Sequence, residues 1–111
     1  MKMWLDDIRP EPFPPRDHRA EYPFDRYAPY DIVCLTADEA LGHILRGVVT
    51  FISFDHDLGQ GKTGYDVARF IEEGAHNGTI KPIHYKVHSA NPVGSINIKI
   101  AMDNAWRTWG E

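Results

Sequence analysis

The chain has 111 residues, of which 42% are hydrophobic and 25% charged, and its formal net charge is −4. These values are typical of one globular domain, and the acidic balance excludes the extended basic surface of a nonspecific nucleic-acid binder. The sequence contains no apolar span of 18 residues, and its single cysteine, Cys34, cannot form an internal disulfide. We therefore predict a single domain, residues 1–111, in the cytoplasm and without a membrane partner.

The first predicted strand, residues 1–5, ends at two aspartates, Asp6 and Asp7. Residues 10–29 then contain six of the eight prolines. Proline fixes φ and removes a backbone donor, so residues 10–30 are predicted to be a loop. A loop of this length is unusual in a compact domain, and two interpretations are open: a functional lid or partner surface, or a variable surface insertion. Its aromatic residues predict that it packs against the fold: Phe13, Tyr22, Phe24, Tyr27 and Tyr30.

Three strand–helix units are predicted after the loop. The strands are expected at residues 31–35, 48–54 and 83–88. The continuous apolar run of residues 48–54 is typical of a central parallel strand, whereas the alternation in residues 83–88 is typical of an edge strand. Two helices are predicted to begin at the capping residues Thr36 and Thr63, and the last helix is predicted to follow a turn at Asn91 and Pro92. Cys34, within the first of these strands, is interpreted as a small buried hydrophobe and not as a nucleophile.

This order of elements predicts an α/β fold. Parallel strands joined by right-handed crossovers would form a three-layer sandwich on a mostly parallel, four-stranded sheet with strand order 2-1-3-4. In that order the ends of the first and third strands lie side by side, and the fourth strand follows. The polar residues after these strands are therefore expected to share one pocket at the carboxyl edge of the sheet.

Four carboxylates are expected in that pocket, and they indicate a metal ion. They are Asp6, Asp7, Asp55 and Asp57. Like charges so close together need a compensating cation, and carboxylate oxygens favour Mg²⁺ or Mn²⁺. His56 has three open roles: a general acid or base, a structural side chain, or a ligand that would favour Mn²⁺, Fe²⁺ or Zn²⁺. The alternative for Asp6 and Asp7 is a solvated turn.

Other residues near the same edge suit a phosphate. Residues 59–64 (GQGKTG) lack the spacing of an NTPase phosphate-binding loop, but Lys62 beside a helix N-terminus can hold one phosphate. The alternative is a flexible lead-in to the helix. His88 is predicted to be a ligand or an acid–base group, and Ser89 can donate a hydrogen bond to a phosphoryl oxygen. Asn91 supplies an amide side chain or only a turn.

In outline the chain resembles response-regulator receiver domains, in which an acidic pair, an aspartate and a hydroxyl follow strands one, three and four. The resemblance implies that Asp55 occupies the position of receiver phosphorylation and that Ser89 occupies the phosphate-sensing position. The chain departs from receivers because it has no fifth strand with its lysine and because the loop at residues 10–30 replaces the first helix. His56 and His88 are also not receiver residues in those roles.

The chain resembles cyclic-phosphate processing receiver domains more closely. The matching motifs are W-L-D-D-x-R-P at residues 4–10, D-H-D-L-G and T-G-Y-D at residues 55–66, and V-H-S-A-N-P at residues 87–92. This resemblance implies a receiver-like (flavodoxin-like) fold with a truncated sheet. It also implies a role with cyclic phosphate ends in RNA.

From these observations we predict a divalent-metal-dependent phosphoesterase that acts on a cyclic phosphate or related phosphodiester, in a small molecule or at an RNA end. The predicted catalytic residues are Asp55, His56 and His88, and Arg9, Lys62, Ser89 and Asn91 are predicted to bind the substrate. In a variant of this mechanism, Asp55 is the nucleophile. Two alternatives are a non-catalytic module that binds a phosphorylated or nucleotide ligand, and an interaction or inhibitor protein that acts through residues 11–30.

Overall fold

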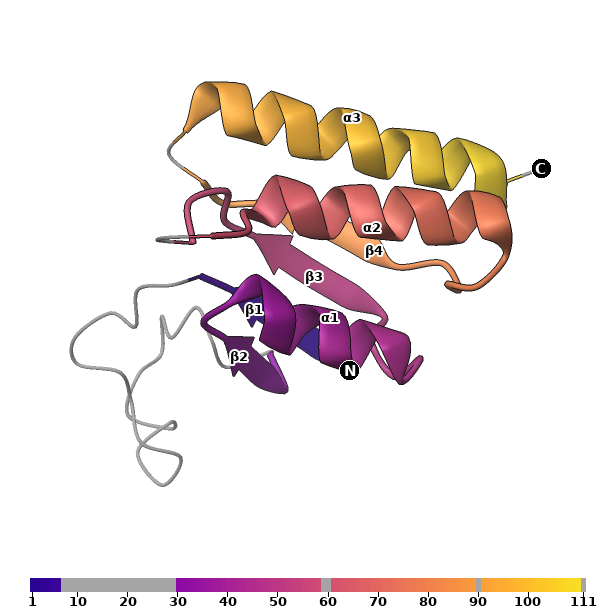
Figure 1. Ribbon diagram of the computed structural model, residues 1–111, viewed down its shortest axis with the longest axis horizontal. Coiled ribbons are helices and arrows are strands. Elements are labelled where there is room, and N and C mark those ends of the chain that lie inside the picture. The colour runs from indigo at the N-terminus through magenta and orange to yellow at the C-terminus, as the bar shows by residue number, and fades with distance from the viewer. Residues whose placement is uncertain (7–29, 59–60, 90, 111) are drawn as a thin grey trace.

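The structure is a computed structural model that describes residues 1–6, 30–58, 61–89 and 91–110. The described residues form four strands and three helices (Figure 1). In chain order these are β1 (Lys2–Leu5), β2 (Ile32–Cys34), α1 (Ala37–Leu45), β3 (Phe51–Phe54), α2 (Gly64–Asn77), β4 (His84–Val87) and α3 (Pro92–Trp109). The strands are all parallel, in the order β2-β1-β3-β4, which confirms the predicted α/β fold and strand order.

The largest difference from the predicted boundaries is in β3. It begins at Phe51 instead of at residue 48. Phe51 pairs with Lys2, the first residue of β1, so residues 48–50 extend past the beginning of the neighbouring strand. Val48 is 42% exposed. An apolar run can therefore be longer than the strand that it contains, because the partner strand sets the length of the ladder.

The helix ends confirm the capping signals. Thr36 Oγ1 accepts a hydrogen bond of 3.2 Å from the backbone N–H of Glu39 at the beginning of α1. Thr63 and Asp66 form a reciprocal capping box at the beginning of α2, and Gly78 ends α2 in the left-handed conformation, with φ of 75°. Residues that carry a side chain rarely adopt this backbone conformation, so glycine suits the position.

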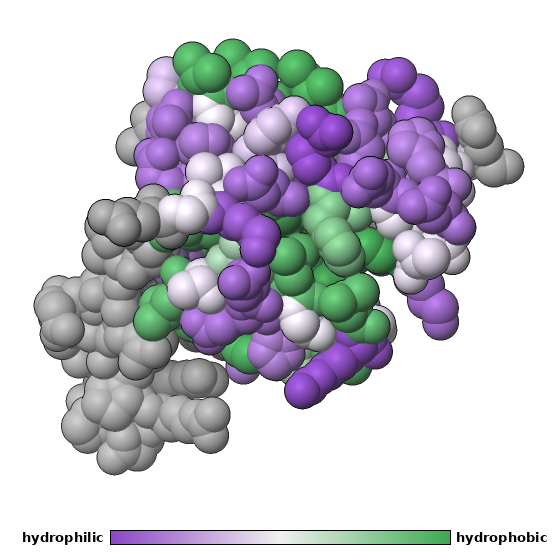
Figure 2. Space-filling view, viewed as in Figure 1, coloured by the Kyte–Doolittle hydropathy of each residue, from purple (hydrophilic) through white to green (hydrophobic). Residues whose placement is uncertain are grey.

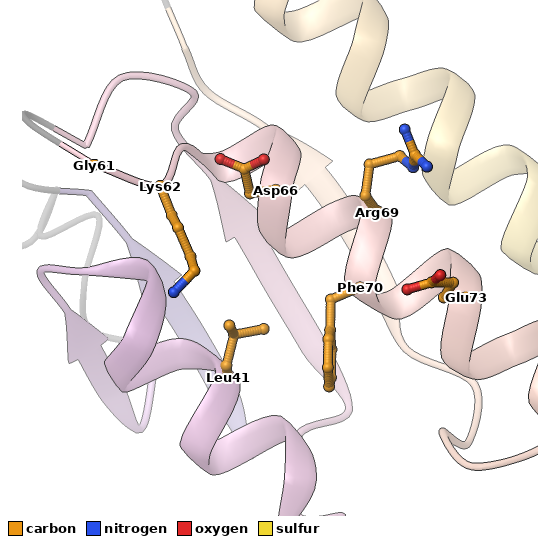
Figure 3. Close-up of a pocket in the computed structure, with 7 residues that line it drawn as sticks. All are labelled: Leu41, Gly61, Lys62, Asp66, Arg69, Phe70 and Glu73. Carbon is orange, nitrogen blue, oxygen red and sulfur yellow. The ribbon is translucent and has the colours of Figure 1, made fainter.

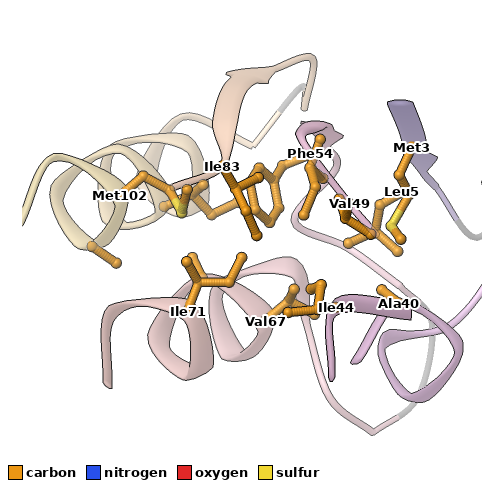
Figure 4. Close-up of a cluster of buried hydrophobic side chains, with 14 of the residues drawn as sticks. Met3, Leu5, Ala40, Ile44, Val49, Phe54, Val67, Ile71, Ile83 and Met102 are labelled. Atoms are coloured by element: carbon orange, nitrogen blue, oxygen red, sulfur yellow. The ribbon is translucent and has the colours of Figure 1, made fainter. Parts of the chain in front are cut away.

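The main core lies between one face of the sheet and all three helices, so the described residues form two layers and not the predicted three (Figure 4). Strand side chains alternate between the two faces, so Met3 and Leu5 point into this core whereas Trp4 lies on the opposite face. There, Trp4 and Tyr30 form a second buried cluster with Val33 and Phe51. Tyr30 belongs to the predicted loop. Its burial confirms, at this one position, that the aromatic residues of the loop pack against the fold. The other four aromatic residues lie outside the described residues.

The surface of α3 carries an apolar stripe (Figure 2). Its residues are Val93, Ile96 and Ile100, each more than half exposed. No helix in the described part of the chain is long and apolar enough to cross a membrane.

Candidate active site

Three polar residues occupy neighbouring positions at the carboxyl edge of the sheet. Asp6, Asp55 and His88 each follow a strand, and the last residues of those strands are paired in register. The ladder continues one step further: the Asp55 N–H donates to the carbonyl of Leu5 over 2.9 Å, and the His88 N–H donates to the carbonyl of Phe54 over 2.8 Å. Regular backbone hydrogen bonds therefore fix all three positions, as the predicted strand order requires.

Three neighbours among the described residues contact the side chain of His88. Its Nε2 lies 3.2 Å from Oδ2 of Asp6, and its Nδ1 lies 2.8 Å from Oγ of Ser53. Its ring stacks on Trp4, with 3.9 Å between ring centroids and 12° between the planes. The side chains of His88 and Asp6 are only 14% and 19% exposed. These contacts hold the His88 ring in one orientation at the carboxyl edge of the sheet.

Sequence reasoning did not find Ser53 or Trp4. One signal was present: Ser53 interrupts the apolar run of residues 48–54, and alternation places it on the same face as Trp4.

His56 belongs to a separate group. Its Nδ1 lies 2.9 Å from Oδ1 of Asp57, and Nδ2 of Asn91 lies 3.4 Å from each of these two atoms. The hydrogen bond to His56 lowers the pKa of the exposed Asp57 carboxyl below its ordinary value, and a bond from Asn91 acts in the same direction. Asn91 also caps α3, since its Oδ1 accepts from the N–H of Gly94 over 2.9 Å. The predicted residues thus form two histidine–carboxylate pairs.

The predicted metal ligands are not assembled by the described residues. No three His, Cys, Asp or Glu side chains in residues 1–6, 30–58, 61–89 and 91–110 are grouped closely enough to hold a metal ion. Asp57 contacts His56 and Asn91, and Asp7 lies outside the described residues. The divalent cation stays a prediction.

The predicted phosphate-binding residues have partners within the protein. Nζ of Lys62 donates to Oδ1 of Asp38 over 2.9 Å, and this bond raises the pKa of the exposed lysine. Figure 3 shows the Lys62 side chain extending toward α1 at one end of a groove of about 460 Å³, in which Leu41 and Phe70 lie between α1 and α2. The Ser89 hydroxyl accepts from the N–H of Asn91 over 3.0 Å, so it also stabilises the turn. Arg9 lies outside the described residues.

A parallel β2-β1-β3-β4 sheet with an aspartate after β1, another after β3 and a hydroxyl after β4 defines a receiver-like α/β domain. The chain belongs to the cyclic-phosphate processing receiver domain family, whose model matches residues 1–104. This confirms the family that the three motifs indicated. No curated protein and no solved structure matches the chain.

Proposed function

We propose that this protein is a phosphoesterase that opens a cyclic phosphate, such as a 2′,3′-cyclic phosphate at an RNA end or in a nucleotide. The observation that supports this proposal is the hydrogen-bonded series Asp6–His88–Ser53 at the carboxyl edge of the sheet. Histidine exchanges protons near neutral pH, and a carboxylate partner orients its ring for that role. The family to which the chain belongs makes a cyclic phosphate the first substrate to test.

In the proposed reaction, a water oxygen attacks phosphorus and one P–O bond of the ring breaks. His88 accepts a proton from the water and returns a proton to the leaving oxygen, so the product is a phosphate monoester beside a free hydroxyl. His56 is the second candidate for proton transfer, because Asp57 supports it in a similar pair. The proposed divalent cation supplies no step in this scheme, and the assay tests it separately.

The test is an assay with an oligonucleotide that ends in a 2′,3′-cyclic phosphate. The protein is incubated with Mg²⁺, Mn²⁺, Zn²⁺ or EDTA, and the cyclic and opened ends are separated by chromatography. We expect conversion to the monoester, and a rate that falls about 10²- to 10⁴-fold in His88→Gln. His84→Gln is the matched control, because His84 is an exposed histidine at the other end of β4.

Two outcomes would contradict the proposal: no turnover under any metal condition, or unchanged turnover in His88→Gln. A rise in melting temperature with the cyclic-phosphate oligonucleotide but no product would favour the non-catalytic binding module instead. Turnover that is lost in EDTA and restored by one ion would support the predicted metal. Equal turnover with and without EDTA would contradict it.

A further inference from the structure

The exposed apolar stripe on α3 lies beside one edge of the sheet. Val93, Ile96 and Ile100 recur at helical spacing and are 66%, 59% and 54% exposed, so their side chains form one ridge of the helix (Figure 2). Ile96 also lines a groove of about 360 Å³ together with Tyr85 and Val87 of β4. The stripe and the strand therefore belong to one side of the molecule. Contiguous exposed apolar surface of this kind is typical of an interaction site.

The outer edge of β4 has no strand partner in the part of the chain that the structure describes. The backbone N–H groups of His84 and His88 donate toward the neighbouring β3 segment, over 2.9 Å and 2.8 Å. Because successive residues of a parallel strand direct their backbone groups to opposite sides, those of Tyr85 and Val87 point away from β3. An edge with outward backbone groups is a template for a further strand.

One two-fold axis would satisfy both the strand edge and the stripe. α3 runs back along the sheet from the carboxyl end of β4 (Figure 1). A rotation that sets two β4 strands antiparallel, edge to edge, therefore also sets two α3 helices antiparallel. The stripe is apolar at all three positions, so its reversal still places aliphatic side chains opposite one another. A single foreign strand would cover β4 but not the whole length of α3, which favours a second copy of this chain.

The charge and the extent of this face also suit a second copy. Lys99 lines the groove, and Asp103 accepts a hydrogen bond of 2.6 Å from Tyr85, so the two charges at the groove are opposite in sign. Lys86 is in register with Ser53 and projects to the other face of the sheet. The 18 residues of α3 give a length of about 27 Å, and with β4 the face spans two layers. That extent is comparable with the roughly 800 Å² that each partner buries in a standard interface.

We propose that the edge of β4 and the apolar stripe of α3 form a homodimer interface, in which two β4 strands pair antiparallel and the two stripes pack against each other. This inference goes beyond the proposed function and does not depend on it. The antiparallel arrangement places the carboxyl ends of the two β4 strands at opposite ends of the dimer, so each copy keeps its own candidate active site.

The first test measures the oligomeric state of the full chain. Sedimentation equilibrium between roughly 1 and roughly 200 μM should show a monomer–dimer equilibrium, since this range brackets a micromolar dissociation constant. Ile96→Glu places a carboxylate in the middle of the stripe in both copies, and we expect it to raise the dissociation constant at least about 100-fold. Leu45→Glu is the matched control, because Leu45 is an aliphatic residue on α1 that is 68% exposed.

The control variant should dimerise as the parent does, and circular dichroism checks that both variants are folded. A monomeric parent would overturn the proposal and assign the stripe to a partner of a different kind. Dimerisation that is unchanged in Ile96→Glu, or lost equally in Leu45→Glu, would also overturn it.

The second test locates the interface at the strand edge by amide hydrogen exchange, measured by NMR at low and high protein concentration. The N–H groups of Tyr85 and Val87 gain hydrogen bonds only in the dimer, so their exchange should slow at least about tenfold as the parent dimerises. The same amides in Ile96→Glu should show no dependence on concentration. The N–H groups of His84 and His88 are the internal reference, because they are already bonded. Unchanged exchange at Tyr85 and Val87 in a dimeric parent would overturn the proposed strand pairing.

Discussion

At the scale of single residues, His56 and His88 occur in different surroundings. His88 lies on the face of the sheet that carries Trp4, with Asp6 and Ser53 at its two nitrogens. His56 lies beside the beginning of α3, where a Cβ atom on Gly94 would overlap its ring. Because their contacts are separate, a substitution can disturb one histidine and leave the other in place.

Gly94→Ala should displace His56. The added methyl group would overlap the His56 ring, and such overpacking typically costs about 1–3 kcal/mol of folding free energy. We expect a lower free energy of unfolding in urea and altered NMR signals of His56, with the signals of His88 retained. Gly42→Ala in α1 is the matched control, because nothing lies within 4 Å of its added Cβ. Unchanged His56 signals in Gly94→Ala would contradict this packing.

The sequence predicted where the residues of the candidate site lie in the fold better than it predicted which side chains contact each other. Asp6, Asp55 and His88 could be placed at neighbouring strand ends because parallel order and period-two alternation determine those positions. The pairing of His56 with Asp57 depends on the path of a loop, which carries no periodicity. The strand-end pattern instead predicted that Asp57 joins the carboxylates that follow the first strand.

At the scale of elements, α2 fixes the loop that carries His56. The N–H of Gly64, the first residue of α2, donates to the His56 carbonyl over 2.9 Å. A Cβ atom at Gly64 would overlap the Asp55 carbonyl, so glycine permits this close approach. Helix beginnings were predictable because capping residues act locally. Strand lengths were less predictable because they depend on a partner that is distant in sequence, as in β3.

Thr63→Ala should destabilise the protein by removing the cap of α2. Thr63 Oγ1 accepts from the N–H of Asp66, and the Asp66 carboxylate accepts from the N–H of Thr63 over 2.7 Å. Loss of a cap of this kind lowers the free energy of unfolding by about 1 kcal/mol. Urea denaturation measures this change, and Thr63→Ser should retain most of the stability because it keeps the hydroxyl. Equal loss in both variants would mean that the hydroxyl is not responsible.

At the scale of the whole molecule, Cys34 is a probe of folding. It is completely buried in β2, and burial, with a smaller effect of Glu39, raises its pKa from 9.0 to about 12. The folded state binds the thiol proton more tightly than the unfolded state does. The contribution of the protonated thiol to folding stability is therefore complete below about pH 9, and it is lost as the pH rises toward 12. At neutral pH the folded protein therefore presents a protonated, inaccessible thiol.

Thiol labelling of Cys34 should consequently report how the molecule opens. In native buffer at neutral pH, we expect labelling at least about 10³-fold slower than in guanidinium, where the chain is unfolded. Cys34→Ala should give no labelling and serves as the blank. If global unfolding exposes the thiol, Thr63→Ala should speed native labelling about fivefold, since it removes about 1 kcal/mol of stability. If labelling in Thr63→Ala matches the parent, exposure occurs instead by local opening of β2, which pairs only with β1 among the described strands.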